Sequence, residues 1–474
     1  MIPKYELKPH QKQGVKDLRR FGGVSLLAGE MGVGKTAQVL SWLRLEWDDA
    51  SPVLIVAPAN AKLVWEDEIA LWLGKRCAVI EGNYRPGRSV LPSAPIWVVN
   101  YDILPSWAEQ LRKHGFKTAV VDEVHYVKNY TSKRYQALRK ALGRFVGRKR
   151  DKWIPSIPYR IAMSGTPLTN RPAELWPTLF LLWPEEFPTP IPYFKRYCRP
   201  RWTPWGIKYD GAANLKELHS RLLDLGMIRQ RKKVCLKELP PKVRRIIHVE
   251  ISRRKEYEFA KENFLLWLSR KSKMRMKSAR RAQAFAQIGY LLRFVSKAKL
   301  RITSEWITNF LESSGDKLVV FAFNRPALDA LHRYFGPKLS IKIDGSVKGT
   351  ERRAAVQRFQ NDPRCRLALC QGKAAGVALT LTAASDILMH DYPWSAGDFL
   401  QIEDRIHRIG QTKTCFIHCL VAVDTIEEKV IRTQRKKMKI LEKILDGEGE
   451  LSSEEMFQFE QSLINELSIE LRRQ

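Results

Sequence analysis

Paired cysteines and long apolar runs are both missing from this 474-residue sequence. Its seven cysteines form no Cys-x-x-Cys motif, so neither a zinc module nor a disulfide framework is indicated, and we expect a reducing compartment. No stretch approaches the roughly 20 apolar residues of a membrane span. The first 14 residues contain no apolar core of a signal peptide. We therefore expect no membrane partner.

Acidic residues are scarce. The sequence has 50 Asp and Glu against 82 Lys and Arg, which gives a net charge of +32. Such a charge favours a polyanionic partner, most often nucleic acid, because it attracts and retains negatively charged ligands. The alternative is a basic surface that serves solubility only. We prefer nucleic-acid binding to a role in solubility alone, because the phosphate backbone of a nucleic acid is attracted to a surface with this much positive charge.

Two series of apolar runs predict parallel strands that alternate with helices. The first series contains GVSLLA, PVLIVAP, IWVVNYD, TAVVDE and RIAMSGTP, and the second contains KLVVFAFN, SIKIDG, CRLALCQ, DILMHDY and CFIHCLV. Continuous apolar runs followed by polar turns are typical of strands buried on both faces of an α/β fold.

The segments between these runs give the expected domain boundaries. Residues 1–233 should form a first lobe with an insertion of short helices at about 184–226, and residues 234–474 a second lobe. The basic segment 228–242, which ends in a proline pair, is interpreted as the linker. In the second lobe we expect a basic helical insertion at about 252–312 and an acidic, amphipathic C-terminal helix at about 450–474. Such a helix more often packs on its own domain than on a partner.

A phosphate-binding loop is predicted at AGEMGVGKT, residues 28–36. The pattern Gly29-x4-Gly34-Lys35-Thr36 follows an apolar strand and precedes a helical sequence, which is the context that this motif requires. Glycines let backbone N–H groups close around phosphates, and the helix N-terminus adds its positive end. Lys35 would reach the β- and γ-phosphates of a nucleotide, and the Thr36 hydroxyl would ligate Mg²⁺. The alternative is an ordinary glycine turn.

Two acids at the end of a predicted strand complement this loop. Asp122 and Glu123 follow the apolar run TAVV, where paired carboxylates are costly unless a positive group lies among them. We expect Asp122 to hold Mg²⁺ and Glu123 to polarise the attacking water. The alternative for the acids alone is a solvated turn. His125 fits a hydrogen-bonded role better than a metal ligand.

These residues carry a family resemblance. LKPHQKQGV, GEMGVGKT, LIVAPANAKLVWEDEIALW, VVNYDIL, DEVHYVKN and MSGTPLTNRPAELW resemble successive motifs of the Swi/Snf-type DNA translocase ATPases of helicase superfamily two. RPAEL resembles the annealing-helicase branch in particular. In the second half, ELPPK, VVFAFNRPALDAL, CQGKAAGVALTLTAAS and QIEDRIHRIGQ continue the resemblance, which spans about residues 5–435.

The resemblance implies a fold of two RecA-like parallel-sheet lobes with ATP and Mg²⁺ between them. It implies a DNA-dependent ATPase with Lys35, Asp122, Glu123, Arg405 and Arg408 as catalytic residues. Both arginines, three apart, should point from one helical face onto the charge that develops on the γ-phosphoryl group. The metal would be held by Thr36 and Asp122. The residues implied to bind the nucleotide are Gln11, Gly29, Glu30, Met31, Gly32, Val33, Gly34, Lys35, Thr36 and Gly376.

The resemblance also implies a duplex that crosses both lobes and is contacted mainly at its phosphates. The basic runs at 139–152 and 269–281 are further candidates, with solvated faces as the alternative. Trp202 and Trp205 fit packing better than stacking. The residues implied to bind DNA are Lys62, Asn100, Lys128, Asn129, Asn324, Arg325, Lys373 and Trp394.

The sequence therefore predicts an ATP-dependent translocase on double-stranded DNA, branched DNA included. The rivals are a strand-separating DNA helicase, an RNA-dependent ATPase on the same fold, and a non-catalytic nucleic-acid-binding protein with a decayed motor. We expect a monomer that is targeted by a protein partner or by the shape of the DNA. A bacterial or viral source is expected, with the protein in the cytoplasm or nucleoid; a eukaryotic protein would be nuclear.

Overall fold

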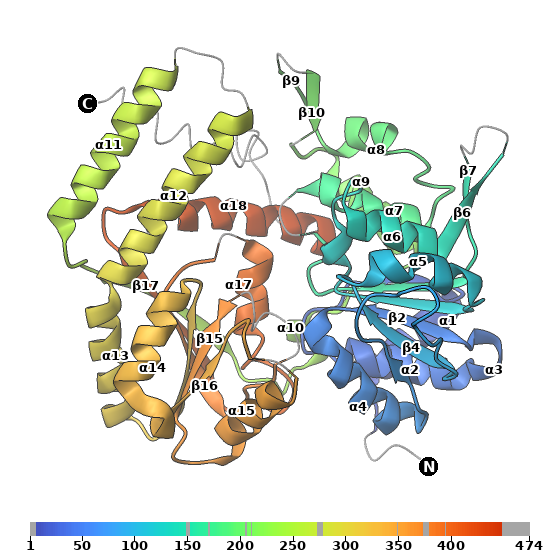
Figure 1. Cartoon of the computed structure of the whole chain (residues 1–474), viewed down its shortest axis with the longest axis horizontal. Helices are drawn as coiled ribbons and strands as arrows, with labels where there is room; N and C mark the ends of the chain where they lie inside the picture. Colours follow the sequence, from blue (N-terminus) through green and yellow to red (C-terminus); the bar gives the residue numbers. More distant parts are fainter. Residues whose placement is uncertain are drawn as a thin grey trace. The chain divides into compact units, whose positions relative to one another are not determined.

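The computed structural model contains two compact units (Figure 1). The first comprises the chain up to Glu238 together with a segment that begins at Lys439, and the second runs from Leu239 to Met438. The structure describes residues 6–147, 152–168, 171–203, 206–209, 211–272, 278–347, 349–372, 379–393 and 395–447.

A parallel sheet forms the centre of the first unit. In the described part of the chain its strand order is β11 (Met227–Ile228), β1 (Val24–Leu27), β8 (Tyr159–Met163), β5 (Thr118–Asp122), β2 (Val53–Ala57), β4 (Ile96–Asn100) and β3 (Ala78–Val79). All residues of β2 and β4 are buried, as expected where helices cover both faces of a parallel sheet. Because β1, β8 and β5 are neighbours, the loops after their carboxyl ends meet at one edge, where open α/β sheets bind ligands.

Helices and short 3₁₀ turns connect these strands. They are α1 (Pro9–Arg20), α2 (Lys35–Leu45), α3 (Trp47–Ala50), η1 (Ala59–Ala61), α4 (Lys62–Leu73), α5 (Leu104–Lys113), η2 (Val124–Val127), α6 (Lys133–Leu142), η3 (Pro172–Glu174), α7 (Trp176–Leu182), α8 (Pro190–Tyr197), α9 (Leu215–Leu225) and α10 (Lys232–Cys235). Pro9 occupies the first helical position of α1, where its missing N–H costs nothing.

The second unit also has a parallel sheet. Its strand order is β12 (Lys242–Val249), β17 (Cys415–Ala422), β16 (Ala384–Met389), β13 (Lys317–Ala322), β15 (Leu367–Gln371) and β14 (Ser340–Ile343). Phe321, Phe359 and Phe399 are completely buried in its core. Its helices are α11 (Arg254–Ser272), α12 (Ser278–Ala298), α13 (Leu300–Ser313), α14 (Arg325–Leu339), α15 (Gly349–Asn361), α17 (Ala396–Glu403) and the first part of α18 (Ile426–Asp446), whose residues from Lys439 onward belong to the first unit.

The predicted α/β class with two parallel sheets is confirmed, and each of the ten apolar runs contains a strand. The segment 228–242 is more ordered than a linker, because its first residue pairs with β1 as part of β11 and residues 232–235 form α10. A strand of two residues is too short to leave a periodic pattern in the sequence.

Two antiparallel hairpins were not predicted. β6 (Gly143–Val146), inside the first basic run, pairs with β7 (Lys152–Pro155), which begins at the last residue of that run. β9 (Pro200–Thr203) pairs with β10 (Gly206–Tyr209) where short helices were expected. Trp202 lies in β9, whereas Trp205 lies outside the described residues. Strands of four residues rich in Pro, Gly and basic residues carry little strand signal.

Three further predictions concern the cysteines, membrane-spanning helices and the segments at 450–474 and 269–281. The seven cysteines are all free thiols. Within the described ranges, no helix has the length and apolar character that a bilayer crossing requires. The predicted acidic helix at 450–474 lies outside the described residues, as does part of the basic run at 269–281.

Candidate nucleotide and DNA sites

The loop between β1 and α2 has the backbone of a phosphate-binding loop. Gly32 and Gly34 adopt φ values of +82° and +80°, a region that favours glycine. Gly34 is the N-cap of α2, and a Cβ there would lie 2.0 Å from Nε2 of Gln11. A side chain at this position would therefore be strained and would displace Gln11.

The ammonium group of Lys35 lies over this loop. Its Nζ donates hydrogen bonds to the carbonyl oxygens of Gly29, at 2.8 Å, and Glu30, at 3.2 Å. Thr36 follows in the first turn of α2 and is partly buried. The positive charge and the positive end of the helix are therefore together at the carboxyl end of β1.

Gln11 is buried against the same loop. Its Nε2 donates to the carbonyl oxygen of Val33 at 3.2 Å, and its Oε1 accepts from the backbone N–H of Lys8 at 2.9 Å. Nε2 of His10 donates to the same Val33 oxygen at 3.0 Å. The nucleotide contact implied for Gln11 stays a prediction, and the structure places its amide next to the phosphate-binding loop.

The two acids lie at the end of β5. Asp122 is the last residue of the strand, and Oδ2 of Asp122 accepts a hydrogen bond from Nε1 of Trp65 at 2.9 Å. Glu123 has φ +49°, an unusual conformation for a residue with a side chain, and such strain is concentrated at functional sites. Its Oε2 accepts from Oγ of Ser164 at 2.9 Å.

His125 joins this second motif to the residues after β8. Its Nδ1 lies 3.2 Å from Oγ of Ser164 and 3.3 Å from Oε2 of Glu123. The hydrogen-bonded role is therefore confirmed for His125. In the described part of the chain, no group of three or more His, Cys, Asp or Glu side chains has the arrangement of a metal site made by protein alone.

The pKa values of the two neighbouring carboxyl groups shift in opposite directions. Burial, followed by the charge of Glu123, raises the pKa of Asp122 to about 6, and the hydrogen bond from Trp65 and the charge of Lys35 act against this rise. Burial would also raise the pKa of Glu123, but hydrogen bonding to His125, the nearby charges and Ser164 outweigh it and lower that pKa. Glu123 is therefore ionised at neutral pH.

The residues present fit a nucleotide with a divalent cation. Lys35 influences both acids electrostatically, so the ammonium and the carboxylates share one region. Backbone N–H groups and an ammonium suit phosphate oxygens, and a hydroxyl and a carboxylate are oxygen ligands of the kind that Mg²⁺ prefers. Gly376, also predicted to bind the nucleotide, lies outside the described residues.

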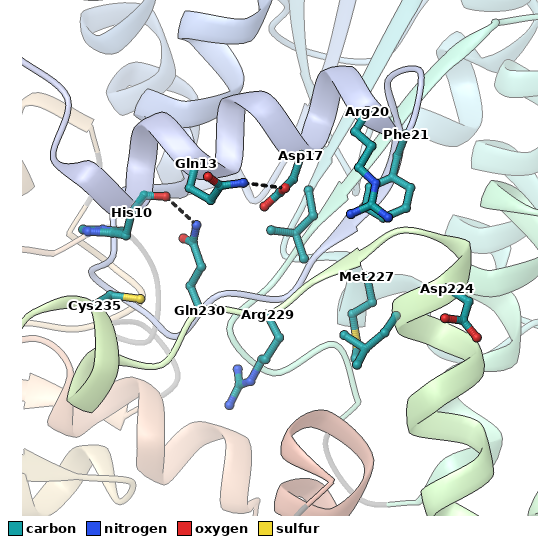
Figure 2. A pocket seen from close by; sticks show the side chains of 12 residues that line it. His10, Gln13, Asp17, Arg20, Phe21, Asp224, Met227, Arg229, Gln230 and Cys235 are labelled. Carbon is teal, nitrogen blue, oxygen red and sulfur yellow. Dashed lines mark hydrogen bonds between the residues drawn. The ribbon is translucent and has the colours of Figure 1, made fainter.

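A cavity of about 560 Å³ lies beside α1 (Figure 2). Gln230 on its wall donates from Nε2 to the carbonyl oxygen of His10 at 2.8 Å. Arg229 donates to the carbonyl oxygen of Ala28 at 2.7 Å and forms an ion pair with Asp446 at 2.7 Å. Because 228–242 was interpreted as a linker, neither residue was predicted to belong to the site. The structure packs both against the phosphate-binding loop.

The predicted DNA contacts of the first unit differ in accessibility. Nζ of Lys62 donates to the carbonyl oxygen of Ile80 at 2.7 Å, and Asn100 is only 6% exposed. Lys128 lies 3.5 Å from the carboxylate of Glu174. Asn129 is exposed, and its Oδ1 accepts hydrogen bonds from Thr131. None of these contacts decides whether the residue binds DNA, so all four stay predictions.

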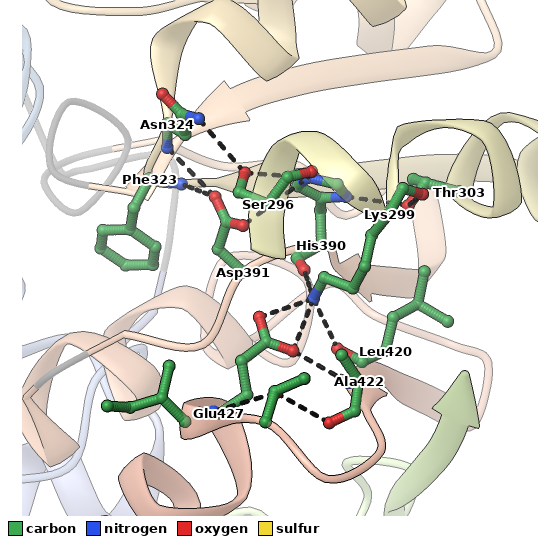
Figure 3. A network of polar contacts seen from close by, with 12 residues as sticks. Ser296, Lys299, Thr303, Phe323, Asn324, His390, Asp391, Leu420, Ala422 and Glu427 are labelled. Atoms are coloured by element: carbon green, nitrogen blue, oxygen red, sulfur yellow. Dashed lines mark hydrogen bonds and ion pairs between the residues drawn. The ribbon is translucent and has the colours of Figure 1, made fainter. Parts of the chain in front are cut away.

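In the second unit, a buried polar network fixes the start of α14 (Figure 3). Oδ2 of Asp391 accepts hydrogen bonds from the backbone N–H groups of Phe323, at 3.0 Å, and Asn324, at 3.1 Å. Nδ2 of Asn324 lies 3.4 Å from Oγ of Ser296. The adjacent Arg325 is 52% exposed along its side chain and lies near Asp344 at 3.2 Å. Lys373 and Trp394, also predicted to bind DNA, are outside the described residues.

The structure brings Arg405 and Arg408 together, although not on a helix. α17 ends at Glu403, and both arginines follow in turns, so the predicted helical face is wrong. Nη1 of each arginine donates to the carbonyl oxygen of Leu379 at 3.3 Å. Glu403, the last residue of α17, is completely buried and accepts charged hydrogen bonds from Lys242 and Arg244 in β12. The catalytic role of Arg405 and Arg408 stays a prediction.

Comparisons with known proteins agree with this arrangement. The model of the SNF2-related domain matches residues 10–299, and that of the helicase conserved C-terminal domain matches residues 298–410. The chain is 31% identical over 446 residues to the SWI/SNF-related matrix-associated actin-dependent regulator of chromatin subfamily A-like protein 1 of Xenopus tropicalis. It is 32% identical over 462 residues to the DNA annealing helicase and endonuclease ZRANB3 of Mus musculus.

The fold and the loop geometry define a P-loop protein of two parallel α/β units. The chain belongs to the SNF2-related family, as the resemblance predicted. The alignments cover 92% and 94% of this chain but 44% and 41% of the frog and mouse relatives, so the chain spans less than half of their length. A solved SWI2/SNF2 ATPase core from Sulfolobus solfataricus in complex with double-stranded DNA aligns with a TM-score of 0.45 and 22% identity. That alignment covers 96% of this chain and 98% of the solved one. The named relatives are animal proteins, so the expected bacterial or viral source finds no support in them.

Proposed function

We propose that this chain is a DNA-dependent ATPase that moves along double-stranded DNA. The observation that carries the proposal is the assembly of Lys35, Asp122 and Glu123 at the carboxyl edge of the first sheet. Family membership and the net charge of +32 support it. The relatives' names refer to chromatin and to DNA annealing, which supports duplex DNA, branched forms included, as the partner. In a eukaryotic cell that partner would place the protein in the nucleus.

The residues of the first unit would divide the chemistry between them. Backbone N–H groups of the loop and the Lys35 ammonium would bind the phosphates, while the Thr36 hydroxyl and the Asp122 carboxylate would hold Mg²⁺. When bound, Mg²⁺ neutralises charge on the phosphates. Glu123 stays ionised and would accept a proton from the attacking water, while its hydrogen bond from Ser164 keeps the carboxylate oriented. Arg405 and Arg408 of the second unit would neutralise charge on the transferred phosphoryl group.

Replacing Lys35 with Ala tests this division of labour. The change should abolish measurable ATP hydrolysis, because it removes the charge that binds the β- and γ-phosphates. Affinity for a short duplex without nucleotide should change less than about two-fold, because Lys35 is assigned to the phosphates of the nucleotide and not to those of DNA. Steady-state phosphate release and fluorescence anisotropy of labelled duplex measure the two properties.

Lys113→Ala is the matched control, since Lys113 is an exposed lysine of the same unit whose Nζ lies 3.8 Å from Glu109. Both activities of this variant should equal those of the wild type. Loss of duplex binding in a folded Lys35→Ala protein would contradict the division. Unchanged hydrolysis in that variant would contradict the nucleotide site itself.

A further inference from the structure

Two buried aromatic residues hold Asp122 from the segments that the sequence predicts to contact DNA. Nε1 of Trp65, in α4, donates to the Asp122 carboxylate at 2.9 Å. The hydroxyl of Tyr101, at the end of β4, donates to the Asp122 carbonyl oxygen at 2.5 Å. Trp65 is 2% exposed and Tyr101 is 1% exposed. The side chain and the backbone of one residue are therefore fixed by two different elements.

Both aromatic residues lie close in the sequence to residues that are predicted to bind DNA. Trp65 lies one helical turn after Lys62, which begins α4, so both residues lie on one side of that helix. Tyr101 directly follows Asn100, and its ring stacks on Tyr126 with centroids 5.1 Å apart. Two of the predicted DNA segments, those of Lys62 and Asn100, thus have within three residues an aromatic side chain hydrogen-bonded to Asp122.

A hydrogen bond to one oxygen of a carboxylate limits its rotation and changes what the other oxygen can do. Residues that hold a metal-binding carboxylate in this way orient it, and their replacement typically weakens metal binding by about 10- to 100-fold. The indole N–H occupies Oδ2 of Asp122. A shift of α4 would move this donor, and the orientation of the carboxylate would change with it.

We propose that Trp65 is a positioning residue that orients Asp122 for the cation and links the cation to the DNA-binding segment at the start of α4. Tyr101 provides a second, weaker link from the end of β4. This inference rests on the proposed function, because it takes Asp122 as the Mg²⁺-binding residue and Lys62 as part of the DNA-binding segment. It adds the residues through which one site affects the other.

The test is an equilibrium measurement that needs no turnover. Mg²⁺ is titrated into the full chain with a fluorescent ADP analogue, with and without a short duplex, and the half-saturating Mg²⁺ concentration is read. Trp65→Phe keeps the ring but removes the N–H donor. It should raise that concentration about 10-fold or more in the absence of DNA.

The effect of DNA tests the link itself. Duplex should change the half-saturating concentration of the wild type by about five-fold or more, as is typical of coupled sites, and by less than about two-fold in Trp65→Phe. Tyr101→Phe, which removes one hydroxyl, should give an intermediate result. Trp107→Phe is the matched control, because Trp107 is also buried and its Nε1 donates to a backbone oxygen, that of Gly82, at 3.0 Å.

The possible results distinguish a failure of the proposed function from a failure of the link through Trp65 alone. A wild type whose nucleotide binding does not depend on Mg²⁺ would overturn the proposed function and this inference together. If the wild type responds to Mg²⁺ and DNA but Trp65→Phe behaves like Trp107→Phe, the inference alone is overturned. If Trp65→Phe does not fold, Tyr101→Phe decides, and an unchanged response to DNA in that variant would contradict the link.

Discussion

Arg405→Ala should lower DNA-stimulated ATP turnover by about 10³- to 10⁵-fold. An arginine that neutralises the charge developing on the transferred phosphoryl group contributes about this much to the rate. Affinity for the nucleotide should change far less, because the phosphate-binding loop and Lys35 belong to the first unit. Steady-state turnover with saturating duplex, together with equilibrium binding of an ADP analogue, measures both quantities.

Because Arg405 is only 5% exposed, its replacement requires a structural control. Arg405→Lys keeps a positive charge but cannot present the planar guanidinium, so it should restore folding without restoring the rate. Arg301→Ala, at an arginine whose side chain is 84% exposed, should leave turnover unchanged. A folded Arg405→Ala variant that hydrolyses ATP within about ten-fold of the wild type would contradict the catalytic role.

Glu123→Gln should lower ATP turnover by about 10²- to 10⁴-fold, the usual contribution of a general base. Glutamine has nearly the same shape, and its amide oxygen can still accept the hydrogen bond from Ser164. It cannot take a proton from water. Nucleotide binding should be retained, since Lys35 and Asp122 are unchanged, and a comparison of turnover with nucleotide affinity therefore isolates the chemical step.

Glu109→Gln is a suitable control for this change, because Glu109 belongs to α5 and its partners are Arg112, Lys113 and Lys140. Its turnover should equal that of the wild type. If Glu123→Gln instead weakens nucleotide binding while the maximal rate stays the same, Glu123 binds rather than activates, and the assignment of the general base is wrong.

The phosphate-binding loop and the paired acids could be predicted because their chemistry depends on neighbours in the sequence. Gly34 and Lys35 need adjacent positions in one turn, and Asp122 with Glu123 needs only the end of a buried strand. The strands could be predicted from the sequence because a strand buried on both faces is continuously apolar.

The contacts that support the site could not be predicted, because they join distant segments. Trp65 lies 57 residues before Asp122, and Gln230 lies 220 residues after His10. The helical face predicted for Arg405 and Arg408 was wrong, since α17 ends at Glu403, which bonds to β12, more than 150 residues earlier in the chain. Tertiary contacts here override the helical pattern of the sequence.

The exposure of single polar residues could also not be predicted from the sequence. Asn100 is a polar residue after an apolar run, which is typical of an accessible loop, yet it is buried as the last residue of β4. Lys62 bends back to the carbonyl oxygen of Ile80. Family motifs predict a DNA-binding segment in the sequence, but packing decides which of its atoms reach the surface.

The central claim is that ATP hydrolysis by this chain is driven by the phosphates of a double helix. Steady-state ATP hydrolysis without nucleic acid, and with duplex DNA, single-stranded DNA or RNA, each at two salt concentrations, tests it most directly. The account predicts strong stimulation by duplex DNA that is lost at the higher salt concentration, because phosphate contacts release counterions. Stimulation by single strands or RNA alone, or no turnover under any condition, would contradict it.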